Sequence, residues 1–191
     1  YIDEQMIRAK AEGFLGPEDH EAKARVALDS NVGVFSLSRT KSNLLMWAHY
    51  TEDFSGFVVG FDDKHPFFEA EDLRDRPRPV AYSSTRRTYP IHREHDPREC
   101  LFEKPLEWAY EEEMRVARFL PEKPTKFSEM GQALHLFEVP GEAISEIIVG
   151  HKAELEMRES VMDTVDSWNL DCELYTALPS GERYEVEFRA F

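Results

Sequence analysis

The stretch GVFSLSRTKSNLLMWAHYTEDFSGFVVGFDD, residues 33–63, decides the fold because its apolar period changes twice. Residues 32–37 repeat with the period of two that a half-buried strand requires. Ser42 or Asn43 can then cap a short helix, and a second alternating run follows at 57–62. The residues that recur at helical spacing between the two runs are Leu44, Trp47 and Ala48. The stretch therefore predicts a strand, a short helix and a second strand.

The remainder of the chain contains short elements of both kinds without regular strand–helix alternation. They are two helices before residue 27, a helix over 155–168 with Asn169 as its end cap, a long polar loop at 83–98, and strands at 112–120, 134–139, 144–149, 172–178 and 183–191. This mixture predicts an α+β fold with a predominantly antiparallel sheet and several packed helices. With 191 residues, 41% of them hydrophobic, the chain can close one core, so we expect a single domain over 1–191.

The composition narrows the setting in which the protein works. The chain has 38 acidic and 23 basic residues and a formal charge of -15, which opposes attraction to nucleic acid backbones and to anionic lipid surfaces. No apolar run is long enough to cross a bilayer, so we expect no membrane partner. Cys100 and Cys172 lie far apart, which indicates neither a disulfide framework nor a zinc site and favours a cytoplasmic location.

The WAHY box, residues 47–50, supplies the first candidate site residues. His49 beside aromatic residues can act as a general base, as a proton donor or as a stacking group. A histidine with apolar neighbours can equally be a core residue whose ring nitrogen has one partner. Both interpretations stay open.

Two glutamates further along the chain are the second candidates. Glu111 and Glu113 are predicted at the mouth of a strand, on one face that Arg115 shares. Two carboxylates held two residues apart can orient a ribose or activate a nucleophile. Glu113 can equally do no more than pair with an arginine across the sheet.

The polar loop at 83–98 is the third candidate. Arg86 and Arg87 can clamp a phosphate-bearing ligand, or they can simply balance an acidic protein in solvent. His92 and His95 have a spacing that a metal could use, but no partner pattern occurs elsewhere, so no metal is predicted. The chain has no phosphate-binding loop, dinucleotide fingerprint, nucleophile elbow or zinc-protease motif.

Motif residues spread over most of the chain carry a family resemblance. They are Phe35, Ser36, residues 44–50, Gly56, Phe57, residues 60–62, Lys104, Trp108, Tyr110, Glu111, Glu113, Arg115, Ile147, Ile148 and Gly150. In order and spacing they resemble the bacterial domain-of-unknown-function family 2971. The resemblance implies no assigned reaction, and only a loose association with bacterial defence and mobile-element genes. Its members usually open with a tyrosine- and basic-rich strand and an F-N-D-P-F segment, so we expect that an upstream segment precedes Tyr1.

A looser resemblance is one of layout. An F-S strand, a later E-x-E strand and an upstream basic residue are similar in arrangement to NAD-dependent ADP-ribosyltransferases. This layout implies that Glu113 orients the nicotinamide ribose, that Glu111 assists, and that NAD is the substrate without a metal. His49 completes the predicted catalytic residues. The predicted substrate-binding residues are Ser36, Trp47, Tyr50, Arg115, Arg86 and Arg87.

We therefore expect an enzyme that acts on a nucleotide, by ADP-ribosyl transfer or NAD cleavage, with a protein or nucleic acid as acceptor where one is needed. Such an activity would suit a toxin or a phage-defence effector. Two other classes stay open: a non-catalytic binding or toxin-effector module, and a nuclease that uses His49 with the acidic residues. An open pocket shared by His49 and Glu113 would favour catalysis, whereas burial and pairing of both would favour the module.

Overall fold

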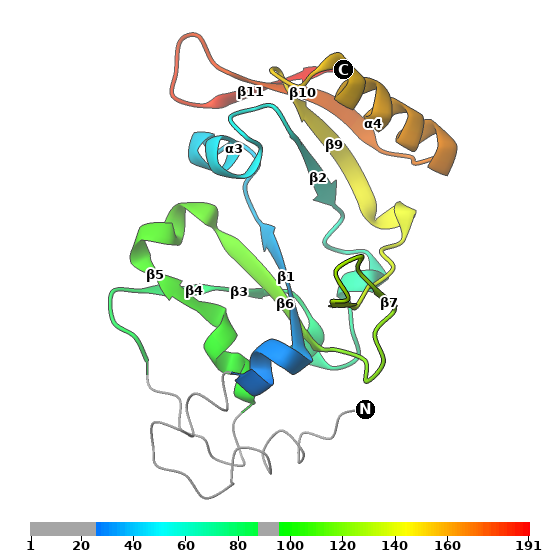
Figure 1. The fold of residues 1–191 in the computed structure, drawn as a ribbon. Helices are drawn as coiled ribbons and strands as arrows, with labels where there is room; N and C mark the ends of the chain where they lie inside the picture. The colour runs from blue at the N-terminus through cyan, green and yellow to red at the C-terminus, as the bar shows by residue number, and fades with distance from the viewer. Residues whose placement is uncertain (1–25, 88–95) are drawn as a thin grey trace, which may run out of the picture. The chain divides into compact units, whose positions relative to one another are not determined.

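The computed structural model describes residues 26–87 and 96–191 (Figure 1). The helices predicted before residue 27 lie almost entirely outside the described residues, as do His92 and His95 of the predicted loop. The chain divides into two compact units made of interleaved segments. Unit 1 comprises Tyr1–Leu37, Arg74–Leu106 and Met114–Glu138, and unit 2 comprises Ser38–Leu73, Glu107–Glu113 and Val139–Phe191. The single domain over 1–191 stays a prediction.

Unit 2 contains a four-stranded sheet in the order β11-β10-β9-β2. The strands are β2 (Phe57–Phe61), β9 (Ile144–Gly150), β10 (Glu173–Pro179) and β11 (Val186–Ala190). β2 is antiparallel to β9, and β11 is antiparallel to β10. β9 and β10 run parallel and are joined through helix α4 (Leu155–Trp168), as a parallel pair requires a crossover.

The two helices of unit 2 pack on opposite faces of this sheet (Figure 1). Helix α3 (Leu44–Tyr50) places Trp47 against Ile148 of β9. The neighbouring side chains of β9, Ile147 and Val149, pack with Val161 of α4, because successive strand residues point to opposite faces. The apolar run at the end of β9 is therefore buried from both sides.

Gly150 ends β9 where the turn after α3 leaves no room for a side chain. A Cβ at Gly150 would overlap the backbone oxygen of Phe54. Phe54 and the two residues before it all have left-handed φ angles, at 49°, 55° and 68° along the chain. The Gly150 N–H also donates to the Gly56 oxygen at 2.9 Å. The turn that follows the WAHY box thus rests directly on the backbone of β9.

Unit 1 contains a three-stranded sheet in the order β1-β6-β3 and two strand pairs, β4-β5 and β7-β8. The strands are β1 (Val32–Ser38), β3 (Arg78–Pro79), β4 (Ala81–Ser83), β5 (Glu103–Pro105), β6 (Glu113–Phe119), β7 (Lys126–Phe127) and β8 (Ala133–Leu134). Its buried core consists of Leu28, Val32, Phe102 and Ala117. Short 3-10 helices connect the strands of both units: η1 (Pro66–Phe68), η2 (Leu73–Asp75), η3 (Pro97–Phe102), η4 (Leu106–Glu111) and η5 (Gly141–Ala143).

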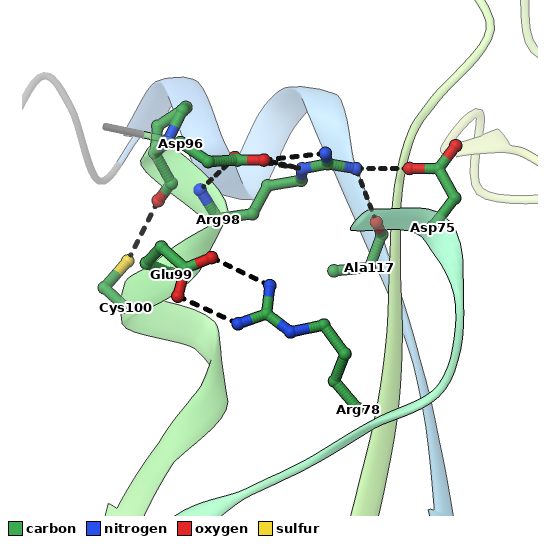
Figure 2. Close-up of polar contacts among 8 residues, drawn as sticks. Asp75, Arg78, Asp96, Arg98, Glu99, Cys100 and Ala117 are labelled. Atoms are coloured by element: carbon green, nitrogen blue, oxygen red, sulfur yellow. Dashed lines mark hydrogen bonds and ion pairs between the residues drawn. The ribbon is translucent and has the colours of Figure 1, made fainter. Parts of the chain in front are cut away.

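A buried arginine holds the loops of unit 1 together (Figure 2). Arg98, at the start of η3, is 2% exposed. Its guanidinium donates to the carboxylates of Asp96 at 2.7 Å and Asp75 at 2.6 Å. It also donates to the backbone oxygen of Ala117 at 2.8 Å. One side chain thus joins η2, η3 and the strand β6.

The predicted fold class is confirmed, since the described residues form an α+β fold with mostly antiparallel sheets. The helix predicted over 155–168 is confirmed, and Asn169 ends it in a left-handed conformation with φ 49°. The strand predicted at 134–139 is wrong, because pairing stops after Leu134 and the following residues are irregular. Alternating polarity alone does not make a strand where no neighbouring strand continues the ladder.

Candidate functional site

The segment that leads into α3 donates hydrogen bonds to the backbone just before β6. Three successive carbonyl oxygens accept hydrogen bonds from residues 38–43. The donors are the Asn43 side-chain amide to Tyr110 at 3.1 Å, the Ser38 hydroxyl to Glu111 at 2.7 Å, and the Arg39 N–H to Glu112 at 3.2 Å. The Asn43 side chain also accepts from the Leu45 N–H at 2.9 Å, so the residue that caps α3 fixes Tyr110 as well. Helix α3, which carries most of the WAHY box and which we call the WAHY helix, and the three glutamates at 111–113 are therefore joined by hydrogen bonds within unit 2.

A short hydrogen bond joins Tyr50 to Glu111. The Tyr50 hydroxyl donates to Glu111 Oε1 at 2.6 Å. Glu111 is 2% exposed, whereas Tyr50 is 59% exposed. The hydrogen bond to Glu111, then desolvation and the nearby charges of Glu111 and Glu113, raise the pKa of Tyr50 from 10.0 to about 12. The buried Glu111 carboxylate therefore opposes ionisation of the exposed Tyr50 hydroxyl.

His49 and Tyr110 form a second pair beside the first. The His49 Nδ1 lies 3.1 Å from the Tyr110 hydroxyl, and the two rings meet edge to face with centres 6.0 Å apart. On its other side, Tyr110 lies 6.1 Å from the ring of Trp108, with the planes tilted by 30°. Trp108 is 39% exposed, and His49 is exposed. His49, Tyr110 and Trp108 thus form a chain of neighbouring aromatic rings, of which His49 and Trp108 are exposed.

Glu113 is also buried, at 6% exposure, but it does not share a strand face with Glu111 as predicted. Glu111 ends η4, and Glu113 begins β6. Glu112 between them has a left-handed φ of 45°, so the two buried glutamates do not share one face of a strand. Both nevertheless raise the pKa of Tyr50 by their charge, which places them near the same hydroxyl. An open pocket shared by His49 and Glu113 would favour an enzyme, and burial of both would favour a binding module. His49 is exposed while Glu113 is buried, so the structure matches neither pattern.

Four predicted binding residues lie in unit 1, outside the group that unit 2 forms. Ser36 is exposed on β1, and Arg86 is exposed. Arg87 lies 3.4 Å from the carboxylate of Glu103. Arg115 of β6 donates to the backbone oxygen of Leu101. The structure thus brings together His49, Tyr50, Glu111 and Glu113, and gives Arg87 and Arg115 partners within their own unit.

Trp47 is a core residue. It is 1% exposed, and its ring stacks on Phe54 with centres 5.2 Å apart. Its indole N–H donates to the Lys41 oxygen at 2.7 Å. A side chain buried to this extent does not face a ligand, so the binding role predicted for Trp47 is corrected to a structural one.

Sequence reasoning missed four residues that shape the site: Ser38, Asn43, Trp108 and Tyr110. The sequence indicates Asn43 only as a helix cap and gives no role to Ser38, since their partners lie more than sixty positions away in sequence. Trp108 and Tyr110 belong to the W-x-Y-E-x-E-x-R motif, and that motif was the signal that could have identified them.

Other features of the described residues do not add to this group. Within 26–87 and 96–191, no three histidine, cysteine or acidic side chains are placed to hold a metal ion together. No helix in the described part of the chain is long and apolar enough to cross a bilayer. An open groove runs along α4, and none of the predicted site residues lines it. Its lining residues are Leu155, Arg158, Glu159, Met162, Asp163, Thr176 and Phe191.

Fold and site together define an α+β protein in which the buried carboxylate of Glu111 accepts a hydrogen bond from the exposed Tyr50. Residues 46–116 match the model of a family described as "Protein of unknown function (DUF2971)", which confirms the family resemblance found in the sequence. The matched span runs from the WAHY box to the strand β6 and contains His49, Tyr50, Glu111 and Glu113. No curated protein and no solved structure matches the chain. The family description assigns no function, and the resemblance to ADP-ribosyltransferases stays a prediction.

The contact between Tyr50 and Glu111 predicts a pH-dependent stability. Between pH 10 and about 12 the folded protein keeps the Tyr50 proton that the unfolded chain releases, so the free energy of unfolding falls as pH rises through this window. Glu111→Gln removes the charge, and we expect the pKa of Tyr50 to fall from about 12 toward its ordinary value of 10.0. Ultraviolet titration of tyrosinate, with Tyr50→Phe subtracted to isolate this residue, measures the shift. An unchanged titration in Glu111→Gln would contradict the contact.

Proposed function

We propose that this protein is an enzyme acting on a nucleotide, and that it breaks the bond between nicotinamide and ribose in NAD. The observation that supports this proposal is the buried carboxylate of Glu111, which accepts a hydrogen bond from the exposed Tyr50 hydroxyl, with Glu113 also buried and His49 exposed. Cleavage of this bond develops positive charge on the ribose, and preorganised carboxylates lower the energy of such charge.

In the proposed reaction the bond between C1′ of the ribose and the ring nitrogen breaks, and both electrons leave with neutral nicotinamide. Glu113 orients the ribose, and Glu111 assists by holding Tyr50. His49 accepts the proton of the attacking water, or of an acceptor group in the case of ADP-ribosyl transfer. The Tyr110 hydroxyl lies 3.1 Å from His49 Nδ1, which supports a fixed orientation of the imidazole in this role.

A second candidate is a non-catalytic binding module. The burial of Glu111 favours it, because the carboxylate is tied to the Tyr50 hydroxyl while its own backbone oxygen accepts from Ser38. Buried groups that are paired in this way are common in purely structural networks.

Glu113→Gln separates the two candidates. The change is nearly isosteric and removes the charge, so in an enzyme we expect a fold close to wild type and NAD turnover lower by roughly 100-fold or more. Chromatographic measurement of NAD loss and thermal melting on the same full-length preparation give both quantities. Glu112→Gln is the matched control, because Glu112 is exposed between the two buried glutamates. Absence of NAD consumption by the wild type, with and without candidate acceptors, would refute the enzyme and leave the module.

A further inference from the structure

Strand β11 forms one edge of the unit 2 sheet, in which the strand order is β11-β10-β9-β2. Its ladder with β10 runs over Val186–Ala190 without a register shift. The opposite edge strand, β2, has such a shift between Gly60 and Phe61. Irregular pairing, proline and lysine discourage a further strand from joining an edge, and β11 contains neither proline nor lysine. β11 is therefore the edge that is better suited to accept another strand.

The hydrogen-bond pattern of the ladder shows which backbone groups of β11 face outward. The Ser180 N–H donates to the oxygen of Glu185, the residue opposite it, at 2.9 Å. Bonded and non-bonded pairs alternate along an antiparallel ladder, so Glu187 and Arg189 also bond toward β10. The residues next to them turn their N–H and C=O groups to the outer edge, where no strand within 26–87 or 96–191 pairs with them. These outward residues are Val186, Phe188 and Ala190.

The side chains of β11 alternate between the two faces of the sheet. Val186 and Phe188 pack in the cluster that contains Trp47 of α3. Glu187 and Arg189 therefore point to the α4 face, where their side chains are 38% and 68% exposed. Among the described residues, the apolar cluster beneath α4 contains side chains of β9 and β10 and none of β11. Helix α4 thus leaves the charged pair of β11 accessible.

We propose that β11 pairs with β11 of a second copy of this chain, antiparallel about a two-fold axis at Phe188. In this register Val186 lies opposite the partner's Ala190, and the outward-facing residues exchange both of their hydrogen bonds. A two-fold interface makes every such contact twice. The unit 2 sheets of two copies then form one continuous sheet. β11 carries none of the residues of the proposed reaction, so pairing of copies and NAD cleavage can be refuted separately.

Charge complementarity favours a second copy as the occupant of this edge. Glu187 lies opposite the partner's Arg189, in a non-hydrogen-bonded pair where facing side chains come closest. Within one copy, Glu187 is 3.6 Å from Arg189 and accepts a hydrogen bond from Ser180. Pairing would therefore place each carboxylate between two arginines. This local attraction opposes the general repulsion between two chains of formal charge -15.

The same charges exclude the neighbouring registers. Sliding one strand by two residues keeps the outward backbone groups paired but moves the axis to Glu187 or to Arg189. Two glutamates or two arginines would then face each other across the axis, which destabilises a strand pair. Sliding by one residue would set outward groups against residues that already bond to β10. The register centred on Phe188 is the one that satisfies both backbone and charge.

Sedimentation velocity of the full chain over about 1 to 300 μM measures the association. One short strand from each copy makes a small interface, so we expect a dissociation constant in the micromolar range. The mass should rise from that of one chain to that of two across this series. A chain that stays monomeric up to the highest concentration would overturn the proposal.

Charge variants test the register. Arg189→Glu sets like charges opposite each other and should weaken association by about tenfold or more. Combining it with Glu187→Arg restores opposite charges and should bring the affinity back to within about threefold of the wild type. Lys123→Glu is the matched control, because Lys123 is exposed in unit 1 and the change in charge is the same. Equal weakening by Lys123→Glu, or no rescue by the double variant, would overturn the proposal.

Ala190→Pro tests the backbone pairing without a change of charge. Ala190 is exposed and its N–H faces away from β10, so proline removes an edge donor and keeps the bonds within the sheet. We expect loss of the dimer with a melting temperature close to that of the dilute wild type. If this variant does not fold, hydrogen exchange of the wild type carries the test. The amides of Val186, Phe188 and Ala190 should exchange more slowly as concentration rises, and a dimer without that protection would use another surface and overturn the proposal.

Discussion

Trp47→Ala is expected to lower the free energy of unfolding by roughly 3 to 5 kcal/mol, the range for truncation of a large core aromatic side chain. The ring is 1% exposed and stacks on Phe54 at 5.2 Å, with planes only 12° apart. It packs in one cluster with Ile148 of β9 and with residues of β10 and β11. The substitution would leave a cavity between α3 and the sheet, and would also leave the Lys41 oxygen without its indole donor.

Urea denaturation followed by circular dichroism measures this loss as a lower midpoint. Trp168→Ala is the control, because Trp168 is 69% exposed and its removal should change stability by no more than about 0.5 kcal/mol. A midpoint equal to that of the wild type in Trp47→Ala would show that packing of the WAHY helix through Trp47 does not stabilise the fold.

Arg98→Met is expected to destabilise the protein by about 3 to 5 kcal/mol, because removing one partner of a buried ion pair leaves the other charge uncompensated. The Arg98 guanidinium forms ion pairs with Asp96 and Asp75 (Figure 2). It also lies 4.8 Å from the ring centre of Phe119. The Asp96 side chain is 9% exposed, so water cannot replace the lost donors fully. Methionine keeps most of the volume, which limits the change to charge and hydrogen bonding.

Arg78→Met is the matched control for this experiment. Arg78 donates to both oxygens of Glu99, at 2.8 Å and 2.9 Å, but both side chains are about one third exposed. Solvent screens such a pair, so we expect a loss of about 1 kcal/mol. Chemical denaturation of the two variants under one set of conditions gives the comparison. Equal losses would mean that burial does not set the strength of the Arg98 network.

Local patterns predicted the elements that have strong periodicity. The strand at 32–37, the helix that Asn43 caps, and the helix before Asn169 all follow from side chains close in sequence. The prediction of a strand at 134–139 was wrong, because a strand depends on a partner strand that the alternation of residues cannot reveal. The strand order β11-β10-β9-β2, with one parallel pair, also depends on long-range pairing and was not derivable.

Sequence motifs identified the residues of the candidate site, but the geometry predicted for them was only partly right. His49, Tyr50, Glu111 and Glu113 are brought together as a group, although the left-handed Glu112 removes the shared strand face that motivated the glutamates. Trp47 lies on the same short helix as His49 and Tyr50, yet a rotation of about 100° per residue turns its side chain to the core. Which face of a seven-residue helix is buried is decided by the sheet against which it packs.

The interleaving of the two units fixes the order in which their parts can be completed during synthesis. Trp47 is made before the residues that bury it with Phe54, which lie on β9, β10 and β11. Until residue 186 has left the ribosome, the apolar face of α3 lacks Val186, the final member of its cluster. An emerging chain with an uncovered tryptophan is a target for chaperones and for aggregation. No contiguous segment of the chain forms either unit, so a chain that stalls before residue 186 lacks a finished unit 2.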